Sequence, residues 1–264
     1  QPGSSVIAAG IYNPTVLKRF NMTWQGEALH TAALPFYSAI EERLSKQFIF
    51  PYPIIKLFTQ TAEHNQWMVA SDRSGLSSYL DPKIYNNSIL GVKAPLGYAK
   101  VKHCGRVDTT ALIQAYKNCI NAHLTTSSFE YSKLNITPSY LTYGEIKAKH
   151  LVFCEGYAMI NNPYFKDVPL VGSKGQILII DAPELKLETI LKGPIFIAPL
   201  GGDKYWAGAS FEQQDKSLNI TAEGAQWIKD KIERMIDVPY TIEKQITHIR
   251  PTVKDRRPLL GTHK

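Results

Sequence analysis

The sequence predicts a mixed fold, α/β to α+β, in which a largely antiparallel sheet is flanked by helices. Two observations carry this prediction. Strand-like segments separated by turn residues crowd the second half of the chain, and helical segments with one apolar face interrupt them. At 264 residues, of which 44% are hydrophobic, the chain is long enough for one large domain or two interleaved ones.

The first half of the sequence alternates helices with short strands. Pro35 suits a first helical turn and apolar residues recur on one face after it, so we predict a helix over residues 33–46. The aromatic and branched stretch 47–60 predicts strands that are broken at Pro51 and Pro53. We further predict a short helix over 63–74, a long loop over 77–97, a strand over 98–104 and a helix capped by Asp108.

The second half of the sequence favours strands. Residues 129–143 offer strand material broken near Pro138, and the apolar stretch 149–155, which ends at Gly156, is typical of a buried strand. A helix capped by Thr221 interrupts the region. Four more predicted strands cover residues 175–181, 195–199, 204–210 and 241–249.

Composition excludes several classes of protein. No run of about 18 apolar residues occurs, so the sequence predicts no membrane-spanning helix. The three cysteines lie far apart without metal-binding spacing, so we expect reduced thiols, no metal site and a cytoplasmic location. The net charge of +7 favours an anionic partner, but Lys and Arg are scattered, which argues against nucleic acid. The sequence leaves the oligomeric state open.

Four segments, taken in order, carry the functional signal. Motifs such as GxSxG and HExxH are absent, so we assign no catalytic side chain, and an enzyme of this sequence would depend on a cofactor. The segments are residues 4–14, 169–178, 205–212 and 249–261. In this order and spacing they resemble motifs of the D-amino acid oxidase and glycine oxidase family of FAD-dependent oxidoreductases. The resemblance covers nearly the whole chain.

This resemblance implies that an FAD-binding part and a substrate-binding part are interleaved along the chain. Residues 1–46, 99–170 and 250–264 would form a partial FAD-binding domain, and residues 47–98 and 171–249 the substrate-binding domain. The family's GxGxxG nucleotide-binding start and its last flavin-contacting segment have no counterpart in the sequence. We therefore expect these residues alone to bind FAD weakly or not at all.

The resemblance also assigns cofactor-binding residues. Small residues in the opening segment would wrap the flavin ring with their backbone, because the ring packs directly on the main chain. A glycine-containing turn packed on the core is the alternative. Gly156 would let the chain pass the dinucleotide, and a plain left-handed turn explains this glycine nearly as well. The predicted cofactor-binding residues are Ser4, Ser5, Ala8, Ala9, Gly10 and Gly156.

Arg250 and Tyr205 are the substrate-binding residues that the resemblance implies. The guanidinium of Arg250 would grip a substrate carboxylate, since it offers two parallel donors to two oxygens. A structural ion pair between Arg250 and Asp255 is the competing account. Tyr205 would contact the substrate as an aromatic wall or through its hydroxyl, or it is an ordinary outward-facing strand residue. Lys174 stands where the family has Arg and lacks the planar fork of a guanidinium.

The implied reaction removes hydride from a carbon that bears an amine, with FAD as acceptor and a small amine or amino acid as substrate. No acid or base is required when a neutral amine is held against the flavin. Two alternatives stay open: a tRNA-modifying relative of the same family, and a non-catalytic module that binds an anionic ligand. The oxidase hypothesis requires the opening segment and the Arg-Pro segment to meet in space, on either side of a slot shaped for a tricyclic ring.

Overall fold

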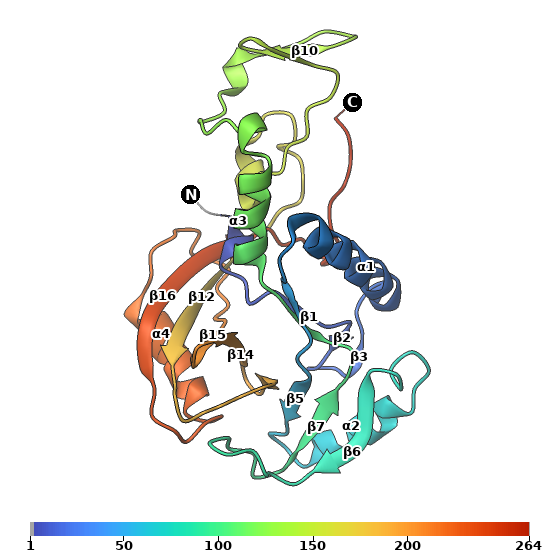
Figure 1. Cartoon of the computed structure of the whole chain (residues 1–264), viewed down its shortest axis with the longest axis vertical. Helices are drawn as coiled ribbons and strands as arrows, with labels where there is room; N and C mark the ends of the chain where they lie inside the picture. The colour runs from blue at the N-terminus through green and yellow to red at the C-terminus, as the bar shows by residue number, and fades with distance from the viewer. Residues whose placement is uncertain (1–2, 264) are drawn as a thin grey trace.

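A curled eight-stranded sheet forms the body of the computed structural model, which describes residues 3–263 (Figure 1). Its order is β16-β12-β15-β14-β13-β5-β7-β6, and every neighbouring pair is antiparallel except β13 and β5. In chain order these strands are β5 (Ile54–Leu57), β6 (Leu80–Tyr85), β7 (Tyr98–Val101), β12 (Ser173–Asp181), β13 (Ile190–Lys192), β14 (Phe196–Gly201), β15 (Lys204–Gly208) and β16 (Thr241–Arg250). The predicted fold class is confirmed.

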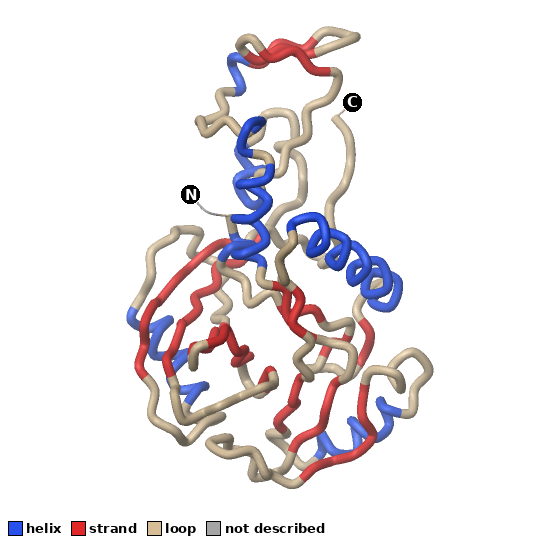
Figure 2. Tube along the Cα trace, viewed as in Figure 1, coloured by secondary structure: helices blue, strands red, loops and turns tan. Residues whose placement is uncertain are grey.

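Three smaller sheets accompany the large one in the described part of the chain. One contains β1 (Ile11–Tyr12), β8 (Gly105–Val107) and β4 (Ile49–Phe50) in antiparallel order. The others are the hairpin of β2 (Thr15–Val16) with β3 (Asn21–Met22), and the sheet of β9 (Leu134–Ile136), β10 (Leu141–Tyr143) and β11 (Ile146–Ala148). Figure 2 shows the part of the molecule that projects beyond the body, which holds β9 to β11, as mainly loop.

Four α-helices surround the sheets in the described range. They are α1 (Gly26–Leu44), α2 (Ala62–Ser71), α3 (Thr109–Cys119) and α4 (Ala222–Ile232). The predicted caps are confirmed: Asp108 accepts the backbone N–H of Ala111 at 3.0 Å, and Thr221 accepts that of Gly224 at 3.1 Å. None of the helices within residues 3–263 has the length and apolar character that crossing a membrane would require.

Two hydrophobic cores cover the two faces of the large sheet. On the first face Leu178, Tyr205 and Ala207 pack with Ile228 and Ile232 of α4. We call it the α4 face. On the second face the core contains Ile177, Trp206, Ala198, Phe58 and Trp67, and it also contains Ala9 of the opening segment. We call it the Arg250 face. Ile246 packs against this core, and Arg250, four residues further along β16, points to the same face because side chains alternate along a strand.

Three predicted elements need correction. Helix α1 begins at Gly26 rather than near residue 33, so Pro35 lies inside it. The Ala- and Leu-rich turns before Pro35 are strong helix formers and outweigh the local cost of the proline. The predicted loop 77–97 contains strand β6, which pairs with β7 at the sheet edge, where Pro82 is tolerated at a register shift.

Residues 149–155 are wrongly predicted as a buried strand. They form no strand, and Val152 is 78% exposed. An apolar run becomes a strand only where a neighbouring strand can pair with it, and this segment lies in the loop-rich projecting part (Figure 2). The division into FAD-binding and substrate-binding parts stays a prediction.

Candidate functional site

The opening segment and the Arg-Pro segment meet on the Arg250 face. Residues Ser4–Val6 form a short 3-10 helix, η1, that contacts β16. The indole N–H of Trp206 donates to the carbonyl of Ile7 at 2.9 Å. Figure 1 shows the blue start of the chain beside the end of β16, at the base of α3. The two segments therefore approach each other, as the oxidase hypothesis requires, and a slot between them for a tricyclic ring stays a prediction.

The backbone of the opening segment is fixed by side chains from two neighbouring elements. Thr109 and Thr110 donate their hydroxyls to the carbonyls of Ser5 and Val6 at 2.6 and 2.8 Å. The buried Arg106 donates from Nε to the carbonyl of Ala9 at 3.0 Å. The side chains of Ser5 and Ala8 stay exposed. The segment therefore presents small side chains on a held main chain.

The two predicted glycines differ in what requires them. Gly10 has a φ of +70°, and a Cβ there would lie 1.9 Å from the carbonyl oxygen of Val107, so its own chain demands glycine. Gly156 opens the short 3-10 helix η4 (Gly156–Asn161) with a φ of +58° and open space around it. Cofactor contact by either residue stays a prediction.

Arg250 is desolvated and has no carboxylate partner among residues 3–263. Its Nη2 donates to the carbonyl of Ser210 at 3.3 Å, and burial lowers the pKa of its guanidinium, which nevertheless stays charged. Asp255 pairs with Arg257 instead, at 3.9 Å between Oδ2 and Nε. The alternative ion pair between Arg250 and Asp255 is therefore not formed. The Arg250 guanidinium thus keeps donors for an anion.

A glycine makes room for this guanidinium. Gly175 lies directly beneath Arg250, and a Cβ at this position would come within 2.3 Å of Nη2. Ser210 is held on β12 in turn, because Gln176 donates its backbone N–H to the Ser210 hydroxyl at 2.8 Å and accepts the Ser210 N–H at 3.0 Å.

Tyr205 does not lie near Arg250. It is 3% exposed on the α4 face, and its hydroxyl accepts the backbone N–H of Leu187 at 3.1 Å. Its neighbour Trp206 is the aromatic side chain that faces the opening segment. Side-chain alternation from Ile177, the register neighbour of Gly208, would have identified Trp206 from the sequence had the strand pairing been known.

A segment after β15 is held beside Arg250 by the buried side chain of Lys174. The fully buried Lys174 forms an ion pair and hydrogen bond with Asp215 and bonds the hydroxyl of Ser217 at 3.3 Å. The backbones of Lys174 and Glu212 exchange hydrogen bonds at 2.8 and 2.9 Å. We call residues 210–217 the strap. The hydrogen bond from Lys174 lowers the pKa of Asp215 to about 2.

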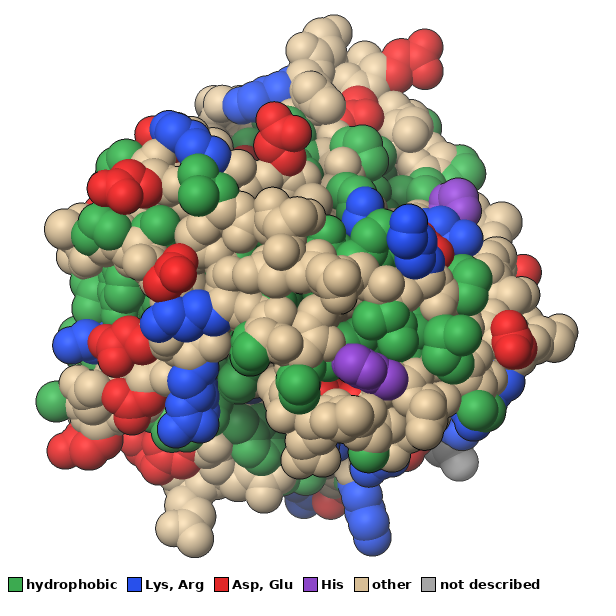
Figure 3. All heavy atoms as spheres, turned by 90° about the horizontal axis from the view of Figure 1, so that it is seen from below, with side chains coloured by type: hydrophobic (Ala, Val, Ile, Leu, Met, Phe, Trp, Pro, Cys, Tyr) green, Lys and Arg blue, Asp and Glu red, His purple; other side chains and the backbone are tan. Residues whose placement is uncertain are grey.

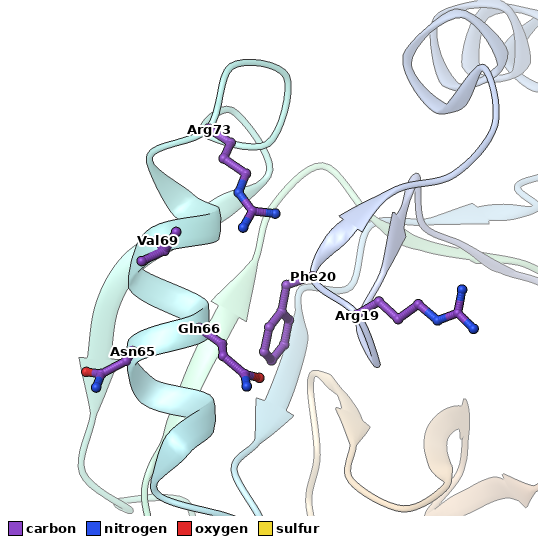
Figure 4. Close-up of a pocket in the computed structure, with 6 residues that line it drawn as sticks. All are labelled: Arg19, Phe20, Asn65, Gln66, Val69 and Arg73. Carbon is purple, nitrogen blue, oxygen red and sulfur yellow. The ribbon is translucent and has the colours of Figure 1, made fainter.

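A separate cavity lies away from Arg250. It measures about 300 Å³, sits between the β2–β3 hairpin and α2, and is lined by Arg19, Phe20, Asn65, Gln66, Val69 and Arg73. Figure 4 shows Arg19 pointing away from α2, so its charge does not enter the cavity. On the face of the molecule seen in Figure 3, basic side chains are interspersed with acidic and hydrophobic ones. Neither feature forms a concentrated anion site.

Comparison with known proteins identifies the family. The FAD-dependent oxidoreductase family model matches residues 2–264. The chain therefore belongs to the family of FAD-dependent oxidoreductases, and the resemblance drawn from its motifs is confirmed.

The individual relatives share only low sequence identity with the chain. Glycine oxidase from Geobacillus kaustophilus matches with a TM-score of 0.79 and 17% identity, over 99% of this chain and 76% of that one. Iminodiacetate oxidase from Chelativorans sp. BNC1 matches with a TM-score of 0.71 and 13% identity, over 98% and 77%. The tRNA 5-methylaminomethyl-2-thiouridine biosynthesis bifunctional protein MnmC of Pseudoalteromonas translucida (strain TAC 125) is 25% identical over 205 residues, which are 76% of this chain and 28% of that protein. The chain thus spans just over a quarter of this relative.

The residues that the structure brings together fit a flavin of this family. The exposed, small side chains of Ser5 and Ala8 leave the main chain open to a planar ring. Trp206 and Ile177 pack in the apolar core on the same face, and Arg250, which has no carboxylate partner among residues 3–263, lies beyond them. The flavin ring, the apolar core around Trp206 and the guanidinium of Arg250 would thus lie on one side of the large sheet.

Proposed function

We propose that the protein oxidises an amine or amino acid that carries an anionic group, with FAD as hydride acceptor. The observation that carries this proposal is Arg250, a half-buried guanidinium without a carboxylate partner among residues 3–263, on the face where the opening segment lies. A charged guanidinium in an apolar setting favours an anion with two oxygens in its plane.

Each residue of the site has a separate task in this proposal. Arg250 binds the substrate carboxylate, and Ser210 orients the guanidinium by accepting from Nη2. Trp206 and Ile177 exclude water from the amine-bearing carbon, which keeps the bound amine neutral. The backbone of Ser4, Ser5, Ala8 and Ala9 would pack on the flavin ring. The bound FAD supplies the hydride acceptor, and no protein side chain is required to transfer a proton.

The proposal is tested first by flavin binding. The sequence has no GxGxxG turn, so we expect the 264 residues alone to bind FAD weakly, and tight stoichiometric binding with a perturbed flavin spectrum would contradict that expectation. The protein expressed from its whole gene should purify with a flavin spectrum. Anaerobic addition of amino acids should bleach that spectrum, and a flavin that no amine or amino acid bleaches would overturn the proposed reaction.

A second candidate substrate is an amine carried on a tRNA base. The similarity to the tRNA-modifying bifunctional protein favours it, since that relative is similar over 76% of this chain. The same spectroscopic assay separates the two candidates: bleaching by a modified tRNA, and not by free amino acids, would select the RNA-borne amine. Absence of flavin from the whole-gene protein would favour a non-catalytic module that binds an anionic ligand.

A further inference from the structure

A second group of cationic side chains lies on the Arg250 face, away from Arg250 itself. Lys56 of β5 and Lys192 of β13 are register partners in the parallel strand pair of the large sheet. Lys56 is 4% exposed, and its Nζ lies 2.7 Å from Oε1 of Glu63 in α2. Lys192 is half-buried, and its Nζ donates to the carbonyl of Gly193 at 2.8 Å. We call Lys192 and its charged neighbours the Lys192 cluster.

The charges of the Lys192 cluster do not balance. The β2–β3 hairpin, which carries Lys18, lies against Lys56, whose Nζ is 6.0 Å from the centroid of the Phe20 ring. Within residues 3–263, Lys56, Lys18 and Glu63 are the charged neighbours of Lys192, so three cations share one carboxylate. Glu63 is engaged by Lys56 and by the backbone N–H of Thr59. Burial, then Lys56, then Lys18 lower the pKa of Lys192 to about 8, against the opposing effect of Glu63. A half-buried ammonium without a counterion is unfavourable, and an added anion would relieve the imbalance.

The Lys192 cluster faces the same side of the sheet as the proposed oxidation site. Lys56 lies over the ring of Phe58, at 5.6 Å, and Phe58 belongs to the core that contains Trp206. The Nζ of Lys192 lies 4.7 Å from the centroid of the Phe196 ring, and Phe196 pairs with Gly208, two residues after Trp206 on β15. Four strand-to-strand steps separate β13 from β16, roughly 19 Å across a flat sheet and less across a curled one.

We propose that Lys192 and Lys18 form an oxyanion subsite on the Arg250 face, and that the substrate carries a second anionic group, a phosphate or a carboxylate, which binds there. A small amino acid cannot bridge the separation between β16 and β13, so the substrate is an elongated amine with anionic groups at both ends. The claim that the bound anion is part of the substrate rests on the proposed function. The claim that the subsite binds an anion does not depend on it.

The subsite is tested by competitive acetylation of lysines with a trace of acetic anhydride, followed by peptide mass spectrometry across a pH series. Only the neutral amine reacts, so the labelling midpoint of Lys192 reports its protonation. Inorganic phosphate is titrated in one arm and acetate in another, with ionic strength held constant by chloride. We expect phosphate to move the Lys192 midpoint upward by about 1 pH unit or more, because a bound anion favours the ammonium.

Two controls give the result its specificity. Lys229, half-buried on α4 on the other face of the sheet, should keep its midpoint in every arm. Lys18→Gln should weaken the phosphate effect on Lys192 several-fold, with near-UV circular dichroism as the check on folding. A shift with phosphate alone identifies a phosphate subsite, and a shift with both anions identifies a general oxyanion subsite.

A Lys192 midpoint that stays constant through both titrations overturns the subsite. The measurement on the unmodified sequence decides this even if the Lys18 variant fails to fold. It uses neither flavin nor amine, so failure of the amine oxidation assay and failure of the subsite are distinguishable.

Discussion

The guanidinium of Arg250 occupies space that exists only because residue 175 is glycine. A Cβ at Gly175 would lie 2.3 Å from Nη2 and 2.7 Å from Cζ, both at the far end of a flexible side chain. We therefore expect Gly175→Ala to displace the head of Arg250 rather than to unfold the sheet, with a stability loss of about 1 kcal/mol.

This displacement would show in kinetics. In the flavin-containing protein expressed from the whole gene, KM for the amine substrate should rise about tenfold or more while kcat changes less, since carboxylate binding and not the hydride step is disturbed. Equal KM values for Gly175→Ala and the original sequence would argue against carboxylate binding by Arg250.

Replacement of Arg250 itself separates charge from geometry. Arg250→Lys keeps the positive charge but removes the second parallel donor, so we expect binding of a carboxylate competitor to weaken by about tenfold, which corresponds to about 1.4 kcal/mol. Arg234→Lys is the matched control, because Arg234 is exposed and follows α4. Spectral titration of the flavoprotein with acetate measures both. Undiminished acetate binding by Arg250→Lys would exclude the bidentate contact.

At the scale of the element, the strap depends on an ion pair whose two members are unequally buried. Lys174 is fully buried, whereas the Asp215 side chain keeps 32% of its exposure. Asp215→Asn leaves a buried ammonium without its carboxylate, but Lys174→Met leaves a carboxylate that water can solvate. We expect Asp215→Asn to lower the urea midpoint more than Lys174→Met at neutral pH.

The acid limb of the stability curve checks the same pair. The folded pKa of Asp215, about 2, lies below the ordinary value, so its contribution to stability is complete above the unfolded pKa and disappears as the pH falls toward about 2. Asp215→Asn should flatten the loss of stability between about pH 4 and about pH 2. Parallel curves for the two proteins in that range would contradict the pairing.

Elements with local signals could be predicted from the sequence, and elements set by pairing could not. The caps at Asp108 and Thr221 were identified correctly because a cap involves residues only a few positions apart. Strand β6 was missed because its identity comes from β7, and residues 149–155 were mistaken for a strand because no partner lies beside them. Helix α1 extends through Pro35 since the preceding residues favour helix strongly.

At the scale of the whole molecule, the site depends on convergence of segments that are distant in the sequence. Ile7 and Trp206 are 199 residues apart and share a hydrogen bond, and Arg106 reaches back to Ala9. Family motifs predicted that the opening and Arg250 belong to one site. They could not decide which of Tyr205 and Trp206 faces it, because that choice follows from the registers of β12, β14 and β15. Lys192 carries no motif, and only the parallel pairing of β13 with β5 brings it to Lys56.

Because Lys192 lies beside Lys56, we expect its contribution to stability to change at alkaline pH. The folded pKa of Lys192, about 8, lies below the ordinary lysine value because burial, Lys56 and Lys18 disfavour its charge, while Glu63 opposes them. Between about pH 8 and about pH 10 the unfolded chain holds the Lys192 proton and the folded protein does not, so the contribution of Lys192 to stability rises with pH. The difference in unfolding free energy between the original sequence and Lys192→Gln, measured by urea denaturation, should therefore increase over this range. Phosphate, by restoring the charge on folded Lys192, should abolish the increase. If this difference in unfolding free energy stays constant with pH, Lys192 titrates like an exposed lysine. Its charged neighbours then do not disfavour the ammonium, and no bound anion is needed to balance their charge.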